Sequence, residues 1–357
     1  MKKLALIGCG GIGTYHLGHL LQFTDIVELA GFCDLIPERA QSFAEKTGGK
    51  AYTDYKVMYD DIKPDIVFIC VPPYCHGEIE YETIRRGIHF FCEKPVALDL
   101  SLAKDIRDRV KKAGIITATG FQCRYSNLVE PTNEFIKKHP TVFIDCVRVG
   151  GVPGVDWWRN KDISGGQIVE QTVHQFDLIR YHHGDPVQVM TYGARGYVNE
   201  VPNYNTDDVS TTIAKFGDGS IASISTGCYA TSGEAFDGKI TFSARDSRAD
   251  LYILGNLNVY GTKDEEADEG GEDTAVIKGD GNLKRSASGA LTYSQDGDAG
   301  ILCDRTFIEG VISGDGSKIR SPYADAVKTL ASFSPAINPW RPESPSTSIT
   351  NDFLEII

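Results

Sequence analysis

The fold is decided by the stretch Leu4-Ala5-Leu6-Ile7-Gly8-Cys9-Gly10-Gly11-Ile12-Gly13. Its apolar half is typical of a buried strand, and its second half has the spacing G-x-G-x-x-G that opens a helix. The first glycine permits a tight turn, the second lets the backbone approach a pyrophosphate, and the last allows close packing of helix on strand. Phosphates bind the unpaired N–H groups at the start of such a helix. The stretch therefore predicts a dinucleotide-binding turn formed by Gly8, Gly10, Gly11, Ile12 and Gly13.

An aspartate stands where the next strand is expected to end. Asp34 follows the apolar run 26–33 and lies 21 residues after Gly13 (34 minus 13). A carboxylate at this distance hydrogen bonds to the ribose hydroxyls of adenosine and repels a 2′-phosphate. The sequence therefore predicts NAD as the cofactor and disfavours NADP, although Arg39 leaves the use of both open. A tight glycine turn that binds no ligand is the alternative interpretation.

Length and composition restrict the class of protein. A chain of 357 residues is too long for one ordinary hydrophobic core, so we expect two domains. The formal charge of -13 argues against nucleic acid or an anionic membrane as a partner, because both would repel the protein. No apolar run approaches the ~20 residues that cross a bilayer. The nine cysteines show neither C-x-x-C nor zinc-site spacing, which favours reduced thiols in a cytoplasmic protein without a metal.

The first third of the chain alternates between strand and helix patterns. Amphipathic stretches separate short apolar runs at 26–33, 65–71, 89–92 and 115–121. This alternation predicts an N-terminal Rossmann domain over residues 1–122, with a doubly wound parallel sheet. Ligands bind beyond the carboxyl ends of the strands in such sheets. We therefore expect one crevice to be lined by the glycine turn, Asp34, Val71-Pro72-Pro73 and Glu93-Lys94-Pro95.

The pattern changes after residue 122. Strand-like segments joined by hairpin turns predominate, with helices expected near 127–138 and 165–182. This order predicts a C-terminal α/β domain over 123–357, with a large open, mostly antiparallel sheet backed by helices on one face. The other face needs cover, and we expect a second copy of the chain to supply it in a dimeric or tetrameric homo-oligomer. The acidic stretch 264–273 is expected to be a solvated loop, with a calcium site as the alternative.

A lysine closes one of the expected strands at the crevice. Glu93-Lys94-Pro95 follows the run 89–92 and places the Lys94 ammonium where a nicotinamide would lie. The ammonium can hold a substrate hydroxyl and stabilise negative charge on its oxygen as the proton leaves. A cis bond before the proline would aim the lysine inward. An ordinary strand end with solvated charges is the alternative.

A second group of candidate residues lies on the helix expected at 165–182. Glu170, His174 and Asp177 stand at i, i+4 and i+7 and would share one face of that helix. A histidine tuned near neutral pH and steered by a carboxylate can take the hydroxyl proton during alcohol oxidation. A surface Glu–His pair or a capped core histidine is the alternative for an isolated helix. The dinucleotide-binding turn favours the catalytic interpretation.

Together these motifs resemble those of the Gfo/Idh/MocA oxidoreductases, the glucose-fructose oxidoreductase and inositol dehydrogenase family. The resemblance extends over essentially the whole chain. It rests on the glycine turn, Asp34, Val71-Pro72-Pro73 followed by His76, Glu93-Lys94-Pro95, Gly120-Phe121-Gln122 with Arg124, and an acid four residues before His174. It implies a Rossmann domain followed by an α/β domain with a large open sheet, often used for oligomer contacts, and activity mainly on sugars, polyols and related compounds.

The resemblance also implies roles for individual residues. Lys94 matches the active-site lysine and His174 the proton-transfer histidine, while Glu170 stands where many members have aspartate. The longer side chain of Glu170 leaves open how His174 is oriented and which catalytic role each of these two residues has. Arg124 is expected to face the nicotinamide or the substrate, and Asp177 to contact substrate or to tie its helix in place. The other expected cofactor contacts are Val71, Pro72, His76, Glu93, Lys94 and Gln122.

Two tryptophans precede the expected catalytic helix. Trp157 and Trp158 can stack on the faces of a sugar, with plain packing or an interface contact as the alternative. Such stacking would place both indoles in the substrate site.

Three functions are compatible with these residues. The favoured one is an NAD-dependent dehydrogenase that oxidises a secondary alcohol of a sugar, inositol or glycoside. In it, Lys94 binds the oxygen, His174 takes the proton and Glu170 orients His174. A second is an enzyme that retains its NAD and cleaves or epimerises a glycoside through transient oxidation. A third is a sugar or dinucleotide sensor without catalysis, and the presence of Lys94 and His174 argues against it.

Overall fold

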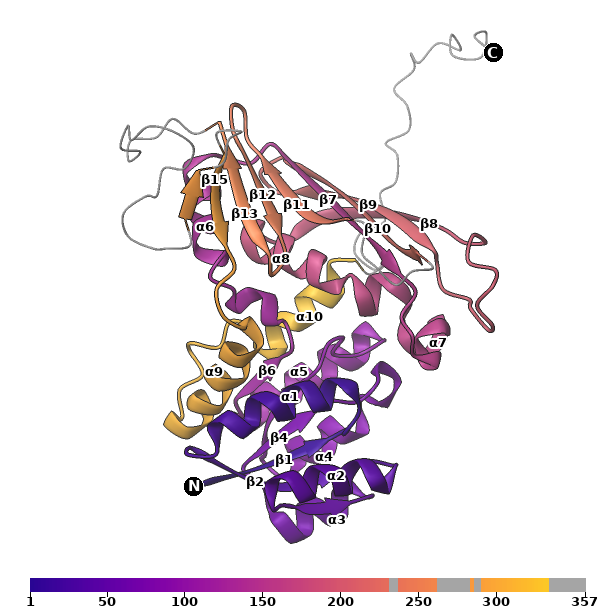
Figure 1. The fold of residues 1–357 in the computed structure, drawn as a ribbon, viewed down its shortest axis with the longest axis vertical. Coiled ribbons are helices and arrows are strands. Elements are labelled where there is room, and N and C mark those ends of the chain that lie inside the picture. Colours follow the sequence, from indigo (N-terminus) through magenta and orange to yellow (C-terminus); the bar gives the residue numbers. More distant parts are fainter. Residues whose placement is uncertain (231–236, 262–282, 286–289, 334–357) are drawn as a thin grey trace.

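Two β-sheets with their helices make up the structure, a computed structural model that describes residues 1–230, 237–261, 283–285 and 290–333 (Figure 1). The first sheet belongs to the N-terminal part of the chain, and the second, broader sheet lies above it in the view of Figure 1. The acidic stretch 264–273 falls outside the described residues. Among the described helices, none combines the length and apolarity needed to cross a membrane.

The first sheet has six parallel strands in the order β3-β2-β1-β4-β5-β6. This is the doubly wound order in which the chain starts at the centre and extends outward on both sides, and it confirms the predicted Rossmann sheet. Its elements are β1 (Lys2–Ile7), α1 (Gly11–Leu20), β2 (Val27–Cys33), α2 (Pro37–Thr47), β3 (Lys50–Tyr52), α3 (Tyr55–Ile62), β4 (Ile66–Ile69), α4 (Glu78–Arg85), β5 (His89–Cys92), α5 (Leu100–Ala113) and β6 (Thr117–Thr119).

Local sequence explains where these elements begin and end. All four residues of β4 are buried, as expected for a central parallel strand covered by helices on both faces. Pro37 opens α2, and Gly48 ends it in a left-handed conformation. The Asp54 carboxylate caps α3 by accepting from the amides of its first turn. Because all strands of this sheet are parallel, their carboxyl ends, and hence its ligand-binding edge, lie on one side.

The second sheet has nine strands in the described residues, in the order β14-β15-β13-β12-β11-β7-β10-β9-β8. Neighbouring strands are antiparallel except β7 and β10, which run parallel. The expected hairpin at 217–220 joins β9 to β10 with Ala222 opposite Ala214. The strands are β7 (Phe143–Gly151), β8 (Pro186–Ala194), β9 (Val209–Phe216), β10 (Ile221–Ala230), β11 (Asp237–Ser243), β12 (Arg248–Tyr252), β13 (Asn256–Tyr260), β14 (Leu283–Arg285) and β15 (Leu291–Ser294).

Helices cover one face of this second sheet. α6 (Val129–Lys138) and α8 (Val173–His183) lie against the face that looks toward the first domain (Figure 1). The strands show the matching alternation, since every second residue of β9 is buried. The predicted open, mostly antiparallel sheet backed by helices on one face is therefore confirmed.

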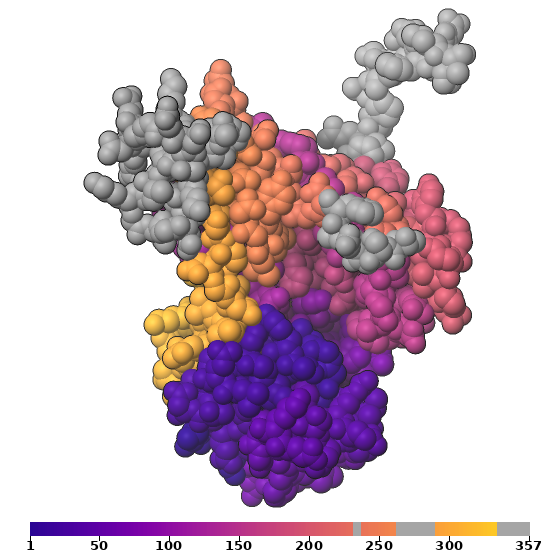
Figure 2. Space-filling model, in the orientation of Figure 1, coloured from indigo at the N-terminus to yellow at the C-terminus, as the bar shows by residue number. Residues whose placement is uncertain are grey.

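Two C-terminal helices return to the first domain (Figure 1), and Figure 2 shows part of this yellow C-terminal region against the indigo N-terminal residues. α9 (Ala299–Ser313) packs on α1 and inserts Phe307 among Leu6, Phe68 and Phe91 of the first sheet. α10 (Tyr323–Ala331) packs on α5, β6 and α8. The domain boundary at residue 122 stays a prediction. The structure adds that α9, from the C-terminal part of the chain, contributes to the core of the Rossmann domain.

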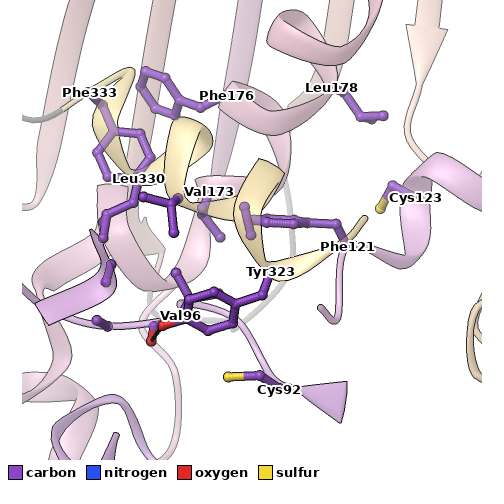
Figure 3. Packing of buried hydrophobic residues seen from close by; sticks show 14 of the residues in the cluster. Cys92, Val96, Phe121, Cys123, Val173, Phe176, Leu178, Tyr323, Leu330 and Phe333 are labelled. Atoms are coloured by element: carbon purple, nitrogen blue, oxygen red, sulfur yellow. Dashed lines mark hydrogen bonds between the residues drawn. The ribbon is translucent and has the colours of Figure 1, made fainter. Parts of the chain in front are cut away.

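A hydrophobic core joins the two parts. Figure 3 shows Phe121 beside Val173 of α8 and Tyr323 of α10, and all three side chains are buried. The Tyr323 hydroxyl donates to the Val96 carbonyl oxygen at 3.2 Å. Burial of apolar surface is worth roughly 25 cal/mol per Å², so these contacts hold α8 against the loop that follows β5. The helix that carries His174 is thereby fixed relative to Lys94.

Candidate active site

A crevice of about 720 Å³ runs along the carboxyl ends of the Rossmann strands. Loops of the first domain form one side, and the segment 155–157 together with Glu170 forms the other. The predicted cofactor residues that line it are Gly8, Gly10, Gly11, Ile12, Asp34, Val71, Pro72, Glu93 and Lys94. The four loops expected to converge from separate parts of the sequence therefore meet at one crevice.

The glycine turn has the shape that a bound pyrophosphate needs. Gly8 has a φ of 92°, and a Cβ there would lie 2.3 Å from the Cys70 carbonyl oxygen. A Cβ on Gly13 would lie 2.0 Å from the Gly8 carbonyl oxygen. α1 begins directly after this turn, and Gly11 and Ile12 at its start are exposed. The glycine turn has no side chains that would block a phosphate from the free amides at the N-terminus of α1. This arrangement fits the phosphates of NAD.

The Asp34 carboxylate lies at the end of β2 beside the turn. Its Oδ2 accepts from the Cys9 amide and its Oδ1 from the Ile36 amide, both at 2.8 Å. Each carboxylate oxygen can accept a further hydrogen bond, so the group can bind ribose hydroxyls while the backbone holds it. Arg39 also lines the crevice. The geometry fits the adenosine end of NAD.

Lys94 is held by a residue of the second domain. Its ammonium donates to Glu170 Oε1 at 2.8 Å and to the Glu170 carbonyl oxygen at 2.9 Å. The other carboxylate oxygen, Oε2, accepts from the Trp158 indole at 2.8 Å. The peptide bond between Lys94 and Pro95 is cis. Trp158, Glu170 and Lys94 thus form a chain of hydrogen bonds into the crevice.

The helix expected at 165–182 is interrupted. α7 (Lys161–Ser164) ends at Gly165, a π-helical turn covers Gln167–Gln171, and α8 begins only at Val173. The two glycines before the π turn have φ values of 81° and 78°, a conformation that favours glycine. The expectation that Glu170, His174 and Asp177 share one helix face is therefore wrong, because Glu170 lies in the π turn and points to Lys94.

His174 is half-buried at the start of α8. Its Nδ1 lies 3.9 Å from Cys123 Sγ, and Phe121 meets its ring edge to face. Within the described residues, the Glu170 carboxylate makes no hydrogen bond to it. Burial, and then the positive charges of Lys94 and Arg148, lower the pKa of His174 to about 3. The imidazole is therefore neutral and able to accept a proton.

Arg124 and Asp177 lie away from the crevice, contrary to their expected substrate contacts. The Arg124 guanidinium donates from Nε to Asp177 Oδ2 at 2.7 Å and from Nη2 to Asp177 Oδ1 at 2.5 Å. Both side chains are 1% exposed. Arg124 also binds Asp325 of α10, so this ion pair ties α8 to α10. The alternative in which Asp177 only anchors its helix is the one that the geometry matches.

Three other expected site residues serve the framework. His76 is buried, and its Nδ1 lies 2.6 Å from Glu80 Oε1. Gln122 accepts from the Tyr15 hydroxyl. Trp158 is fully buried and cannot stack on a sugar, so its expected substrate contact is wrong. Trp157, in contrast, lines the crevice.

Two family models match the chain. The oxidoreductase family model with an NAD-binding Rossmann fold matches residues 2–121, and the GFO/IDH/MocA C-terminal domain matches residues 142–264. The chain belongs to the Gfo/Idh/MocA family of oxidoreductases. This match confirms the family resemblance and the prediction of NAD as the cofactor.

Relatives of this Gfo/Idh/MocA chain include two bacterial dehydrogenases. The chain is 29% identical over 228 residues to myo-inositol 2-dehydrogenase of Thermotoga maritima. The aligned region covers 62% of this chain and 67% of the relative. It is 30% identical over 192 residues to D-glucoside 3-dehydrogenase of Escherichia coli, which covers 52% of this chain and 54% of the relative. The chain thus spans about half to two thirds of the length of these relatives.

Solved structures share the whole Gfo/Idh/MocA architecture. A levoglucosan dehydrogenase in complex with NADH and levoglucosan has a TM-score of 0.76 at 19% identity and covers 92% of this chain and 94% of its own. The WlbA dehydrogenase from Bordetella pertussis, in complex with NADH and UDP-GlcNAcA, has a TM-score of 0.73 at 18% identity, over 92% of each chain. These similarities confirm the fold of both domains.

Sequence reasoning missed a buried network behind the crevice of this Gfo/Idh/MocA oxidoreductase. His16 of α1 lies with Nε2 3.0 Å from Glu93 Oε1 and with Nδ1 2.8 Å from Asp304 Oδ2 of α9. His19 Nδ1 approaches the same Asp304 oxygen at 2.8 Å. Burial alone would lower the pKa of His16, but Asp304 and Glu93 raise it to about 10. A charged imidazole therefore holds the Glu93 carboxylate at the floor of the crevice.

One signal in the sequence points to this network. His16 falls at a position of the helix stripe Gly13, Leu17 and Leu20, which faces the sheet. A histidine in an apolar stripe needs polar partners. Its partner Asp304 is distant in the sequence, so the pairing was not predictable from the residues alone.

Proposed function

We propose that this oxidoreductase transfers hydride between NAD and a secondary alcohol of a sugar, inositol or glycoside. One observation carries the proposal. The Lys94 ammonium lies in the crevice that also holds the glycine turn and Asp34, and its charge acts on the neutral His174. An alcohol dehydrogenase needs this combination of a cation for the oxygen and a base for the proton. The names of the inositol and glucoside dehydrogenase relatives support the same class of reaction.

Lys94 and His174 divide the work on the reacting hydroxyl. When bound, NAD accepts the hydride from the carbon that carries this hydroxyl, or returns it in the reverse direction. Lys94 donates to the oxygen and stabilises the negative charge that develops there as the proton leaves. His174 accepts that proton at Nε2, which makes no hydrogen bond among the described residues, while Nδ1 approaches Cys123 Sγ. Burial first, and then the charges of Lys94 and Arg148, lower the pKa of His174 and keep it neutral before the reaction.

Glu170 acts on Lys94 rather than on His174. Its carboxylate and carbonyl oxygens hold the ammonium in place while the buried Trp158 fixes the carboxylate. The ammonium has three donors, and Glu170 occupies two of them. The third is left to bind the substrate oxygen. We therefore assign Glu170 the role of positioning Lys94, in place of the expected role of orienting His174.

A comparison of variants tests the proposal. NADH formation would be measured with NAD and, separately, NADP across inositols, aldoses and glycosides. We expect turnover with NAD that falls by about a hundredfold or more in Lys94→Ala and His174→Ala. NAD binding, measured by calorimetry, should persist in both. Tight NAD binding without NADH from any compound would reject the dehydrogenase and favour an enzyme that retains its NAD.

We also infer a homo-oligomer and a cytoplasmic location. The outer face of the second sheet carries an apolar groove lined by Met190, Ile213 and Ile221, of which the two isoleucines are 39% and 44% exposed. A second copy of the chain can cover it. All nine cysteines are free, which suits a reducing compartment. Sedimentation of the protein and of Ile213→Asp tests the assembly, since only the variant should be monomeric, and cell fractionation tests the location.

A further inference from the structure

An arginine of the second sheet lies on the face that the helices cover. Arg148 lies on β7 on the same side of the strand as the buried residues Ile144 and Cys146. This is the side that the helices cover, and Arg148 is only half-buried near its open end. Gly150, two residues on, leaves room for the guanidinium, since a Cβ there would lie 3.2 Å from Arg148 Nη1. The backbone thus makes space for this cation.

Among the described residues, one nitrogen of the Arg148 guanidinium has a hydrogen-bond partner. Nη1 donates to the Gly227 carbonyl oxygen at 3.3 Å and to Cys228 Sγ at 3.1 Å, both on β10. Nε and Nη2 make no hydrogen bond within the described residues, and neither atom is buried. In the described part of the chain, no carboxylate comes within ion-pair distance of Arg148. The two free nitrogens carry their hydrogens on the same edge of the guanidinium.

Other arginines of this chain show what that edge binds. Arg124 uses its Nε and Nη2 to hold both carboxylate oxygens of Asp177. The buried Arg180 is also paired, with Asp185 and Asp325. The Nε/Nη2 edge matches the two oxygens of a carboxylate or phosphate, and paired binding is stronger than two separate neutral hydrogen bonds. Arg148 presents the same edge without an anion.

The position of Arg148 relates this edge to the reacting groups. Gln167, which opens the π turn, donates to Ser210 Oγ at 2.6 Å and to the Thr226 carbonyl oxygen at 3.4 Å. Thr226 lies on β10 just before Gly227 and Cys228, so the π turn and the Arg148 guanidinium rest on the same stretch of strand. Glu170 lies in that turn and binds Lys94. The charges of both Lys94 and Arg148 act on His174.

The local charges leave Arg148 without compensation. Glu170 already neutralises Lys94, and His174 is uncharged. An uncompensated, partly desolvated guanidinium attracts an anion more strongly than a fully solvated one.

We propose that the free Nε/Nη2 edge of Arg148 binds an anionic substituent, a carboxylate or a phosphate, on the substrate. This proposal rests on the proposed function for the hydroxyl that reacts, and it narrows the substrate class to acidic sugars. Lys94 and His174 hold the reacting hydroxyl, and Arg148 sets which sugar is bound and how it is turned. The acidic group takes no part in the redox step, so the reaction needs no reactant besides the alcohol and NAD.

Ligand binding to the NADH-loaded protein tests this site independently of turnover. Calorimetry would compare D-glucose, D-glucuronate and glucose 6-phosphate, which differ in the presence and kind of anion. We expect one of the two anions to bind about ten- to a hundredfold more tightly than glucose, as hydrogen bonds to charged groups do. Which of the two binds more tightly decides between carboxylate and phosphate. Equal affinity for all three would overturn the proposal.

Variants separate this site from general electrostatics. Arg148→Gln should bind the anionic sugar no more tightly than glucose, and Arg148→Lys should keep part of the preference for the anion. Arg248→Gln is the matched control, because it removes the same charge from an exposed position of β12 in the same sheet. An anion preference that survives in Arg148→Gln, or that disappears in Arg248→Gln, would overturn the assignment. Anion-selective binding without NADH formation from any acidic sugar would keep the site and reject the dehydrogenase.

Discussion

Lys94 Nζ lies 2.8 Å from Glu170 Oε1, although the two residues come from different domains. The π turn at Gln167–Gln171 makes this contact, because it directs Glu170 across the crevice instead of along the helix toward His174. Single π turns in helices occur frequently at functional sites. The length of the glutamate has a second consequence, since its Oε2 also reaches the indole of Trp158 at 2.8 Å. The position of Lys94 therefore depends on a buried tryptophan.

Trp158→Phe tests this dependence. The substitution keeps an aromatic ring in the buried site but removes the hydrogen bond to the Glu170 carboxylate, which is worth about 1.5–3 kcal/mol for a charged acceptor. We expect kcat to fall about tenfold or more, with the KM for NAD unchanged. Trp157→Phe is the control, because the neighbouring indole lines the crevice and makes no hydrogen bond to Glu170 among the described residues. Equal losses in the two variants would show that the indole hydrogen bond does not matter.

Asp34→Asn should weaken the discrimination between the two nicotinamide cofactors. The amide oxygen can still accept one backbone N–H, as Asp34 does from Cys9 and Ile36. The negative charge that repels a 2′-phosphate is lost, and Arg39 beside the turn then favours that phosphate. We expect the ratio of kcat/KM for NADP over NAD to rise by about tenfold. A ratio unchanged by the substitution would mean that Asp34 does not contact the ribose, and thermal unfolding controls for folding.

The residues that could be predicted from the sequence are those whose chemistry is local. The glycine turn, Asp34 and the strand-ending Lys94 each follow a strand pattern directly, so their convergence follows from the parallel sheet. The wrong expectations involve Glu170, Arg124 and Trp158, whereas Asp177 matches the alternative in which it ties its helix in place. The spacing i, i+4, i+7 has a fixed meaning only on a regular helix, and two glycines before the π turn break that regularity.

Long-range pairing explains the remaining differences. Arg124 and Asp177 resemble site residues in the sequence, but together with Asp325 of α10 they form a buried framework. His16 was passed over because its partner Asp304 belongs to α9, near the other end of the chain. Neither pairing leaves a local pattern. A single sequence therefore predicts which loops meet at the crevice but not which charged residues are already paired with one another.

The pH dependence of turnover should reflect the neutral state of His174. Its pKa is lowered to about 3 by burial and by Lys94 and Arg148. A base in this state remains unprotonated across about pH 5–8, so we expect no loss of kcat/KM in that range from protonation of His174. Arg148→Gln removes one of the lowering charges and should move the acid limb of the kcat/KM profile to higher pH. An acid limb near the ordinary histidine value in the unaltered protein would contradict this assignment.

His16→Gln should destabilise the protein most strongly at neutral and acidic pH. The pKa of His16 in the folded protein is raised to about 10 by Asp304 and Glu93, above its ordinary value of 6.5, despite the opposing effect of burial. A raised pKa means that the folded state holds the proton more tightly than the unfolded chain does. The stabilisation is therefore complete below the ordinary value and is lost as the pH rises toward about 10.

Breaking a buried ion pair by removing one partner costs about 3–5 kcal/mol. Urea unfolding at low pH should therefore show a loss of stability of this order in His16→Gln, and the loss should shrink steadily with rising pH. Gln22→Ala on the same helical segment, where the side chain is exposed, is the control. A deficit independent of pH would mean that His16 contributes packing alone and that its charge does not hold Glu93 at the crevice.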